Sequence, residues 1–275
     1  MKVCLLAEST PSPVLVSALD LAAARHTVVD FDPRTLTGGF ATRPVEVRDV
    51  DLYLLKSRSA AALAYAEAAQ CAGSLVLNTP AGTAAALDRV TMATRLRTAG
   101  VPVPRSRTAD SLRGLTAAAG PELDRPLVIK SRRSRRGDLV TRVDDLAGLQ
   151  SLLPEWGDEP VIAQEFLAND GYDLKFWVID QHLTVARRPA ALHERTTAHD
   201  VALDPGQLPP EWLSVVVDAG AALDLEIFGV DVLVTDGGPV VIDVNAFPGF
   251  RSSANAAHAL ADLIDRKTAA RRRSA

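Results

Sequence analysis

The order of apolar and polar positions predicts strands that alternate with helices in the first part of the chain. Short apolar runs typical of buried strands are separated by longer segments in which Ala and Leu recur at helical spacing. This alternation indicates a parallel sheet covered by helices on both faces, an α/β arrangement. The predicted strands cover residues 2–7, 26–31, 51–57 and 74–78, and the predicted helices cover 11–26 and 59–73.

A helical connector follows this first unit. Residues 79–87 predict a short helix, and residues 88–100 predict a second one with Asp88 as its N-cap and Gly100 at its C-terminal end. Residues 101–109 are expected to be extended, because their prolines exclude helix.

The second half of the chain predicts hairpins instead. After its last predicted helix, the basic residues 266–275 are expected to form a disordered tail. The predicted elements are two strands around a loop in 125–143, a helix at 144–153, a strand at 159–168, a hairpin at 172–190, a polar loop at 193–212, a helix at 211–225, a hairpin at 226–245 and a helix at 254–266.

Composition narrows the class of protein. A chain of 275 residues that is 47% hydrophobic can bury a large core, and its net charge of −4 argues against general nucleic-acid affinity. Cys4 and Cys71 lack CxxC partners, so both are expected to be reduced and buried. The apolar start is too short for a signal peptide, and no run approaches the length of a membrane span. We therefore expect a cytoplasmic protein.

The hairpin at 226–245 carries polar residues on strands that otherwise look buried. With a three-residue loop at 236–238, the register pairs Asp231 with Asp243. Because strand side chains alternate, one face is wholly apolar. The apolar face would hold Val230, Val232, Val234, Val240, Ile242 and Val244, and the other face Asp231, Leu233, Val241, Asp243 and Asn245.

Two directly opposed carboxylates repel each other, so a cation is expected between them. Oxygen donors without His or Cys favour Mg²⁺, and Asn245 adds a neutral oxygen to Asp231 and Asp243. The alternative is that Asp231 pairs with an Arg and Asp243 caps the turn near Pro248. A loop that differs by one residue would place the two Asp residues on opposite faces.

The chain has neither a GxxxxGK[ST] loop nor a GxGxxG motif after its first strand, so phosphate-binding residues are expected in another part of the chain. Lys130 ends an apolar strand, and the loop 131–138 that follows contains Ser134, Gly137 and four arginines. Such a loop suits a mobile lid that closes over a triphosphate, because it is charged and buries little apolar surface. A solvated hairpin tip is the alternative.

The strand in residues 161–167 and the next hairpin add further candidates. An exposed backbone beside apolar side chains, as expected at the end of 161–167, suits an adenine ring. Asp173 and Lys175 share a strand face, and Arg187 and Arg188 end the following strand. These basic side chains are suited to an anionic ligand, with solvated hairpin faces as the alternative.

In this order, the segments resemble the ATP-grasp superfamily over nearly the whole chain. Residues 52–106 are similar to its first domain and linker, 126–138 to its phosphate-binding lid, and 161–189 to its adenine strand and following hairpin. Residues 229–250 resemble its metal hairpin, the most specific part. The similarity is greatest to RimK-type glutamate ligases, with some resemblance to ATP-grasp inositol polyphosphate kinases.

The resemblance implies roles for individual residues. Lys130 would bind the α- and β-phosphates of ATP, while Lys175 and Arg187 would be catalytic and neutralise the transferring phosphate. The implied ATP-binding set, with the backbone of residues 165–167 at the adenine, is Arg89, Lys130, Ser134, Gly137, Gln164, Glu165, Phe166, Leu167 and Asp173. The implied ligands of one or two Mg²⁺ ions are Asp231, Asp243 and Asn245.

The chain departs from the family pattern at three places. The family usually has Lys where this chain has Arg89, which keeps the charge but changes the donor geometry. The lid is rich in Arg where Gly is usual. Residues 192–200 lack the Asn and paired Gly typical of RimK-type ligases, so the acceptor and product stay open.

The resemblance also implies a fold, an ATP-grasp fold with an N-terminal Rossmann-like parallel-sheet domain, α/β overall and α+β in its nucleotide-binding part. The expected parts are a Rossmann-like domain at 1–78, a helical linker and connector at 79–125, a lid subdomain at 126–168, a C-terminal subdomain with the metal hairpin at 169–265 and the tail at 266–275.

The implied function is an ATP-dependent carboxylate–amine ligase. ATP would phosphorylate a substrate carboxylate, and an amine would attack the acyl phosphate, releasing ADP and phosphate. The partners would be small-molecule or peptide acids and amines, without membrane or nucleic acid, and the oligomeric state stays open, with a homodimer as one alternative. A second alternative activity is a kinase acting on a polyol or inositol phosphate with Arg187, Arg188 and His193, and a third is a nucleotide-binding protein without catalysis, suggested by Arg89.

Overall fold

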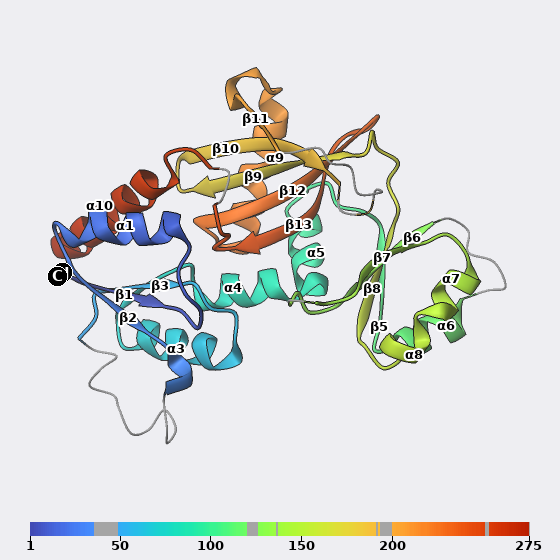
Figure 1. Cartoon of the computed structure of the whole chain (residues 1–275), viewed down its shortest axis with the longest axis horizontal. Helices are drawn as coiled ribbons and strands as arrows, with labels where there is room; N and C mark the ends of the chain where they lie inside the picture. The colour runs from blue at the N-terminus through green and yellow to red at the C-terminus, as the bar shows by residue number, and fades with distance from the viewer. Residues whose placement is uncertain are drawn as a thin grey trace.

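Three sheets, joined by two short helices, make up the molecule (Figure 1). The computed structural model describes residues 1–35, 49–119, 126–135, 137–190, 192, 200–250 and 253–274. No helix within these ranges is long and apolar enough to cross a membrane.

The N-terminal sheet is parallel, as predicted, with the strand order β2-β1-β3-β4. Alternate residues of its third strand enter different cores: Leu52 and Leu54 pack in one cluster, and Tyr53 and Leu55 in another. Both faces of the sheet are therefore buried. Its elements are β1 (Lys2–Leu6), α1 (Pro13–Ala23), β2 (Thr27–Phe31), η1 (Pro33–Thr35), β3 (Leu52–Leu55), α3 (Ala60–Cys71) and β4 (Leu75–Leu77).

The connector consists of α4 (Pro80–Leu87) and α5 (Arg89–Thr98). The Asp88 carboxylate caps α5 by accepting hydrogen bonds from the first-turn backbone N–H groups, and Gly100 follows the helix with a φ of 78°. The predicted start and end of this helix are confirmed.

The small sheet has the order β5-β8-β6-β7 and is antiparallel. Its helices and strands share one core, which includes Leu112, Ile129 and Leu149. Helix α6 is absent from the sequence-based prediction, which leaves residues 110–124 unassigned. The elements are β5 (Ser106–Ala109), α6 (Leu112–Ala118), β6 (Leu127–Ser131), β7 (Val140–Val143), α7 (Leu146–Ser151), α8 (Leu153–Trp156) and β8 (Val161–Glu165).

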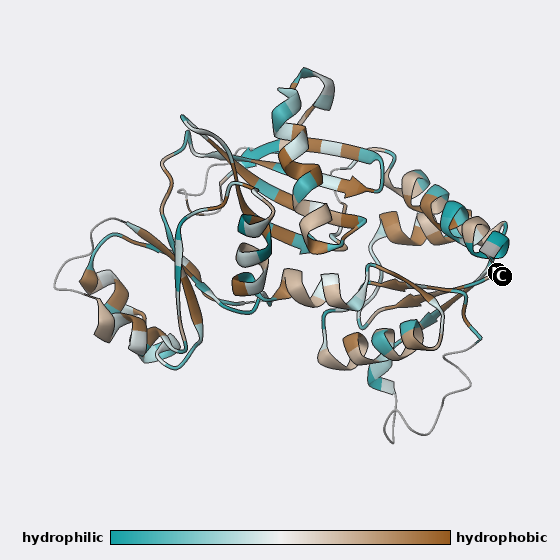
Figure 2. Cartoon of the chain, turned by 180° about the vertical axis from the view of Figure 1, so that it is seen from behind, coloured by the Kyte–Doolittle hydropathy of each residue, from teal (hydrophilic) through white to brown (hydrophobic). Residues whose placement is uncertain are grey.

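The large sheet has the order β11-β10-β9-β12-β13. One face packs on α4, α5 and α9, where hydrophobic residues dominate the strands (Figure 2). The other face contributes Trp177, Ile179 and Ile227 to the core shared with the N-terminal sheet. The elements are β9 (Tyr172–Ile179), β10 (His182–Pro189), β11 (Val201–Leu203), η3 (Pro205–Gln207), α9 (Pro210–Leu223), β12 (Ile227–Thr235) and β13 (Gly238–Ala246).

The prediction of a disordered tail at 266–275 is wrong for its described residues. Helix α10 runs over Ala256–Ser274 and packs against α1. Its basic residues find distant partners: Lys267 pairs with Glu226 at 2.5 Å, and the Arg271 guanidinium donates to the Gly73 carbonyl. These contacts hold the last turns of the helix against the fold, and cations at a helix C-terminus are favourable in themselves.

The hairpin of β12 and β13 corrects one prediction and confirms another. Thr235 pairs with Gly238, so the loop has two residues rather than three. A register shift between Asp231 and Val232 restores the predicted pairing of Asp231 with Asp243. The shift also exchanges two neighbours: Val241 is buried in the apolar core, and Ile242 lies on the opposite face.

Gly220 on α9 is required by close packing. A Cβ atom at this position would lie 2.2 Å from the Cζ atom of the buried Phe228 ring. We expect Gly220→Ala to lower the free energy of unfolding by about 1–3 kcal/mol, the usual cost of overpacking a core. Urea unfolding measures it. Gly237→Ala is the matched control, because the nearest atom to its Cβ is 3.7 Å away. Equal stability of both variants would contradict the close packing.

Candidate active site

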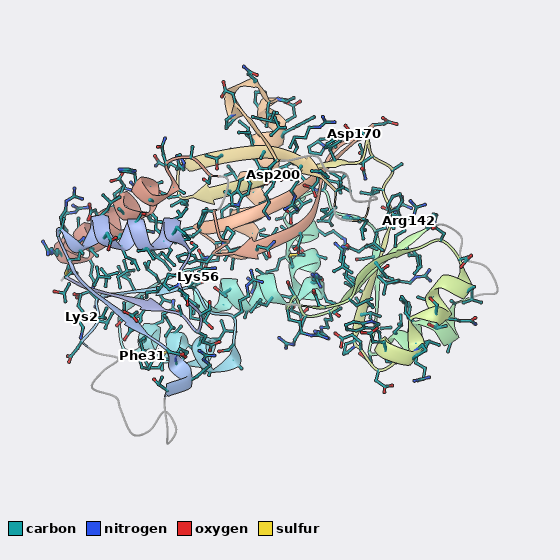
Figure 3. The ribbon with its side chains drawn as sticks, in the orientation of Figure 1. Lys2, Phe31, Lys56, Arg142, Asp170 and Asp200 are labelled. Atoms are coloured by element: carbon teal, nitrogen blue, oxygen red, sulfur yellow. The ribbon has the colours of Figure 1, made fainter. Side chains whose placement is uncertain are left out.

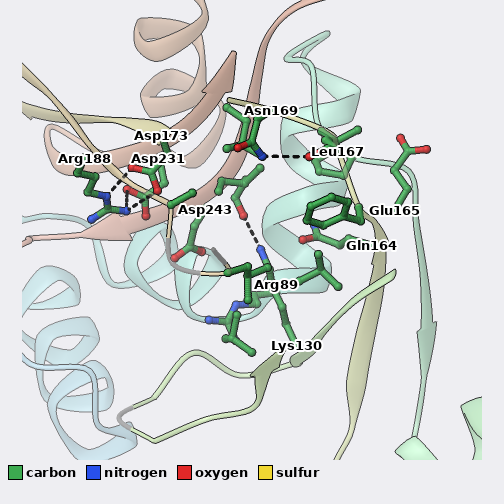
Figure 4. A pocket seen from close by; sticks show the side chains of 18 residues that line it. Arg89, Lys130, Gln164, Glu165, Leu167, Asn169, Asp173, Arg188, Asp231 and Asp243 are labelled. Carbon is green, nitrogen blue, oxygen red and sulfur yellow. Dashed lines mark hydrogen bonds and ion pairs between the residues drawn. The ribbon is translucent and has the colours of Figure 1, made fainter. Parts of the chain in front are cut away.

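A pocket lies between the small sheet and the large sheet (Figure 4). Strands β6 and β8 supply one wall, and β12 and β13 supply the other. Four of its charged lining residues come from the large sheet: Asp173, Arg188, Asp231 and Asp243. Three more come from the opposite side: Arg89, Lys130 and Glu165. The pocket brings together residues that are far apart in the sequence.

Lys130 and Arg89 place two cations at this pocket. Lys130 Nζ donates to the Ile242 carbonyl at 2.9 Å, and its pKa is lowered because the side chain is buried. The Asp243 carboxylate acts on that pKa in the opposite direction. Arg89 Nη1 donates to the Ser131 carbonyl and the Asp138 carboxylate, while its buried Nε has no partner. Both predicted phosphate-binding cations therefore line the pocket, and each has N–H groups to offer.

An apolar zone adjoins these cations. Gln164, Glu165, Phe166 and Leu167 all line the pocket, as the sequence predicts. The guanidinium of Arg142 lies 4.0 Å from the centroid of the Phe166 ring. The remaining apolar side chains of the lining include Val128, Leu233 and Ile242. Flat apolar walls beside a backbone segment suit a heteroaromatic ring.

Asp243, Asp231 and Lys175 form a row across the large sheet, which we call the acidic row. Asp243 opposes Asp231 on β12, and Asp231 opposes Lys175 on β9. Directly opposed residues share a face, so the three side chains stand side by side. Gly229 makes room for the lysine, because a Cβ there would lie 3.1 Å from Lys175 Cε. A larger residue at this position would require the lysine side chain to shift by a few tenths of an ångström.

Two cations already lie beside Asp231. Its Oδ1 is 2.6 Å from Lys175 Nζ and 2.9 Å from Arg188 Nη2, so the alternative interpretation of Asp231 as the partner of an Arg is realised. Asp243 does not cap the Pro248 turn. Its Oδ2 accepts from Asn245 Nδ2 at 3.1 Å, and its buried Oδ1 has no hydrogen-bond partner among the residues that the structure describes.

This donor set fits Mg²⁺. The partnerless Asp243 Oδ1 is a buried carboxylate oxygen that lacks a donor, and such an atom is costly without a cation. Asp231 lies directly opposite, and the set contains oxygen ligands without His or Cys. No group of three His, Cys, Asp or Glu residues capable of holding a metal occurs among the described residues, so the remaining positions would fall to water and phosphate oxygens.

Arg187 and Arg188 lie on different sides of β10. Arg187 pairs with Asp170 at 2.8 Å and lies 3.7 Å from the centroid of the Tyr172 ring, away from the pocket lining. Arg188 lines the pocket and donates to Asp173 at 2.5 Å. Adjacent strand residues face opposite sides, so only one of the two can reach the acidic row. The position of Arg187 outside the pocket lining does not favour its predicted catalytic role, which stays a prediction.

Asp173, which Arg188 contacts, has a raised carboxyl pKa. Burial raises the pKa of the Asp173 carboxyl to about 6, although the Arg188 guanidinium acts to lower it. Between about pH 4 and pH 6 the folded protein thus holds a proton that the unfolded chain releases. Stability from this group is present below pH 4 and is lost as the pH rises through 6.

We expect Asp173→Asn to remove this loss. Over pH 4–6 the contribution to the free energy of unfolding falls by at most about 1.4 kcal/mol per pH unit in the wild type, and this slope should be missing in the variant. Urea unfolding at several pH values measures both slopes. A variant with the same slope as the wild type would contradict the assignment of the proton to Asp173.

The loop after β6 departs from the predicted mobile lid. Ser134 and Gly137 do not line the pocket, and the Ser134 N–H donates to the Leu87 carbonyl at 2.9 Å. Arg132 pairs with Asp88 at 2.9 Å, and Arg135 pairs with Glu159. Two of the four arginines of the loop therefore have carboxylate partners within the protein, and the mobility of the loop stays a prediction. Arg136, and His193 of the kinase alternative, lie outside the described residues.

Comparison with known proteins gives one consistent family. Residues 86–264 match the model of the RimK-like ATP-grasp domain. A probable alpha-L-glutamate ligase of Thioalkalivibrio sulfidiphilus strain HL-EbGR7 is 31% identical over 130 residues, which are 45% of this chain and 43% of the relative. A ribosomal protein bS6--L-glutamate ligase of Shigella flexneri serotype 5b strain 8401 is 25% identical over 183 residues, 64% of this chain and 61% of the relative. The chain thus spans between two fifths and two thirds of these relatives.

The fold has a similar solved structure along almost its whole length. The crystal structure of the RimK domain protein ATP-grasp from Sphaerobacter thermophilus DSM 20745 superposes with a TM-score of 0.76. Its sequence is 23% identical, and the match covers 96% of this chain and 99% of the other. The expected ATP-grasp fold is confirmed.

Proposed function

This chain belongs to the RimK-like ATP-grasp family, and we propose that it is an ATP-dependent carboxylate–amine ligase that forms an amide through an acyl phosphate and releases ADP and phosphate. The observation that carries the proposal is the pocket in which Lys130 and Arg89 face the opposed carboxylates Asp231 and Asp243. Cations on one wall and hard oxygen donors on the other suit a polyphosphate with its Mg²⁺.

ATP would lie with its adenine against the apolar zone and its phosphates at the cations. The backbone of residues 165–167 follows an apolar strand and lies beside the Phe166 ring, which suits the purine. Lys130 Nζ, which donates to a neutral carbonyl, and Arg89 Nε, which has no partner among the described residues, would contact the α- and β-phosphates. Bound Mg²⁺ would neutralise phosphate charge from a position held by Asp231, Asp243 and Asn245.

The chain's own residues supply charge and orientation at the reacting end. Arg188 is held by Asp173 and Asp231, so its planar guanidinium is fixed before substrate binds. Lys175 lies next to it on Asp231. A cation fixed in this way stabilises negative charge on the transferring phosphoryl group without reorganisation during the reaction. No covalent group from the protein is required.

For the substrates we propose glutamate as the amine and a small molecule or a peptide as the acid. The support is the naming of the similar relatives as glutamate ligases, one of which acts on ribosomal protein bS6. We further propose the cytoplasm as its compartment, because the reaction consumes ATP.

Release of ADP under three sets of conditions tests the proposal. A ligase releases ADP only when ATP, an acid and an amine are all present. A kinase releases ADP with ATP and a polyol or inositol phosphate, without any amine. A nucleotide-binding protein without catalysis releases none under any condition. Either of the last two results would overturn the ligase assignment.

A further inference from the structure

Lys56 lies where the N-terminal sheet meets the C-terminal end of β13, the strand that carries Asp243. It follows β3 directly, and its backbone N–H still donates to the Leu6 carbonyl of β1 at 3.0 Å. It therefore stands at the carboxyl edge of an open parallel sheet. Ligands of such sheets bind in the crevice outside this edge. Figure 3 labels Lys56 between the N-terminal sheet and the large sheet.

The side chain of Lys56 reaches across to β13. Lys56 Nζ donates to the Phe247 carbonyl at 2.6 Å and lies 5.6 Å from the centroid of the Phe247 ring. Phe247 comes four residues after Asp243, a distance of roughly 13 Å along an extended strand. The Lys56 ammonium group thus lies at the C-terminal end of β13, the strand that carries Asp243.

Lys56 has no anionic partner among the residues that the structure describes. The hydrogen bond that its ammonium group makes within the described residues goes to a neutral carbonyl. Burial lowers the pKa of the Lys56 ammonium to about 8, and the neighbouring Arg58 adds to this effect. By contrast, Lys175 pairs with Asp231 and Lys267 with Glu226. A partly buried cation without a counter-ion is costly, so this position gains from an anion brought by a ligand.

The surroundings of Lys56 favour negative charge further. Ser59 caps the twelve-residue helix α3, and its Oγ accepts from the Ala62 N–H at 3.0 Å. Helix α3 therefore begins four residues after Lys56, and its N-terminus carries partial positive charge. Ser57, between them, is buried with a hydroxyl that accepts from the Ser59 N–H. Ser59 Oγ also donates to the Glu8 carboxylate, so the helix terminus already has an anionic partner, and the Lys56 ammonium is the charge that a ligand carboxylate would meet.

We propose that Lys56 binds a carboxylate of the amine substrate. This inference rests on the proposed ligase activity. The carboxylate of the acid substrate must reach the terminal phosphate of ATP, and it gives up its charge when it is phosphorylated. An amino acid that serves as the amine keeps its own carboxylates throughout the reaction, so it needs a permanent counter-ion away from the metal. Lys56 supplies that charge.

The test measures binding of three probes by calorimetry, in the presence of a non-hydrolysable ATP analogue and Mg²⁺. The probes are L-glutamate, its α-amide L-isoglutamine and its γ-amide L-glutamine. The wild-type protein should bind L-glutamate at least tenfold more tightly than one of the two amides. Lys56→Met should bind L-glutamate as weakly as the wild type binds that amide, and Lys56→Arg should regain part of the preference.

Matched measurements separate substrate binding from a structural role. Lys267→Met removes a lysine that joins α10 to β12, and it should keep the preference for L-glutamate. If Lys56→Met instead lowers the thermal unfolding temperature and weakens the ATP analogue and all three probes equally, Lys56 is a structural tether and the inference is wrong. A wild-type protein that binds the three probes equally, or binds none, also overturns it.

Failure of the ligase assignment gives a different pattern. In that case the wild type releases no ADP with any acid and amine, while the loss of L-glutamate discrimination in Lys56→Met persists. If ADP release does require an acid and an amine, but Lys56→Met keeps the wild-type preference, the ligase assignment stands and the role of Lys56 falls.

Discussion

Replacing Asp243 with Asn should abolish ADP release while leaving the protein folded. The substitution removes a carboxylate oxygen that is buried without a hydrogen-bond partner, and with it the charge that would hold Mg²⁺. We expect turnover to fall by about 10²–10³-fold or more. Because Asp243 directly opposes Asp231, the neutral amide also relieves repulsion in the metal-free protein. The thermal unfolding temperature without Mg²⁺ should therefore be unchanged or higher.

Asp236→Asn is the matched control for this prediction. Asp236 is exposed in the two-residue turn of the same hairpin, far along the strands from the acidic row. It should keep wild-type turnover. If Asp243→Asn releases ADP at the wild-type rate in the presence of Mg²⁺, the metal assignment is wrong. Loss of turnover together with loss of the folded state would point to a structural role instead.

The second large effect is expected at Arg188. Arg188→Met removes a guanidinium that contacts both Asp173 and Asp231 inside the pocket, and turnover should fall by about 10²–10³-fold. The loss should appear in kcat rather than in the KM for ATP, because the group acts on charge that develops in the transition state. Arg188→Lys should restore only part of the rate, because an ammonium cannot span both carboxylates.

Arg187→Met provides the comparison within the same strand. Arg187 contacts Asp170 and the Tyr172 ring on the other side of β10, so its loss should change turnover little. Steady-state ADP release measures both variants, and thermal unfolding verifies that both are folded. If Arg187→Met were the inactive variant and Arg188→Met the active one, the sequence-based assignment would be right and the geometric one refuted.

The hairpin illustrates how much of the site is readable from sequence. The assumed three-residue loop predicts that Asp231 opposes Asp243, yet the loop has two residues, and the pairing is realised because a bulge offsets the difference. A contact from outside the hairpin accompanies the bulge. The Val241 N–H donates to the Pro102 carbonyl of the connector at 2.9 Å, which fixes that residue toward the core. No local pattern in the hairpin reports a contact with residue 102.

The choice between Arg187 and Arg188, by contrast, was available from the sequence. With Asp180 and Gln181 as the turn, the pairing runs from Ile179–His182 to Asp173–Arg188. Opposed residues share a face, so Arg188 belongs with Asp173 by counting alone. Resemblance to a family supplies a role for an arginine at the end of the strand, but only the register decides which of two adjacent arginines holds it.

The anchored loop after β6 and the helical end of the chain could not be predicted in this way. Both depend on partners distant in sequence: Arg132 meets Asp88, and Arg271 meets Gly73. From the sequence alone, a run of arginines predicts either a solvent-exposed segment or a binding site for an anionic ligand. Carboxylates and carbonyls brought close by the fold satisfy the same guanidinium groups.

Helix α10 gives the molecule an unusual order of assembly. It packs on α1, and Asp265 on it bonds His26 at 2.7 Å across 239 positions of sequence. One core cluster extends from Val3 to Ile264. During synthesis on the ribosome, α1 covers only part of this face of the N-terminal sheet, and the cluster stays incomplete until residues 256–264 of α10 have been made. Such long-range closure slows folding, and it makes the earliest segment the one that waits longest for its partner.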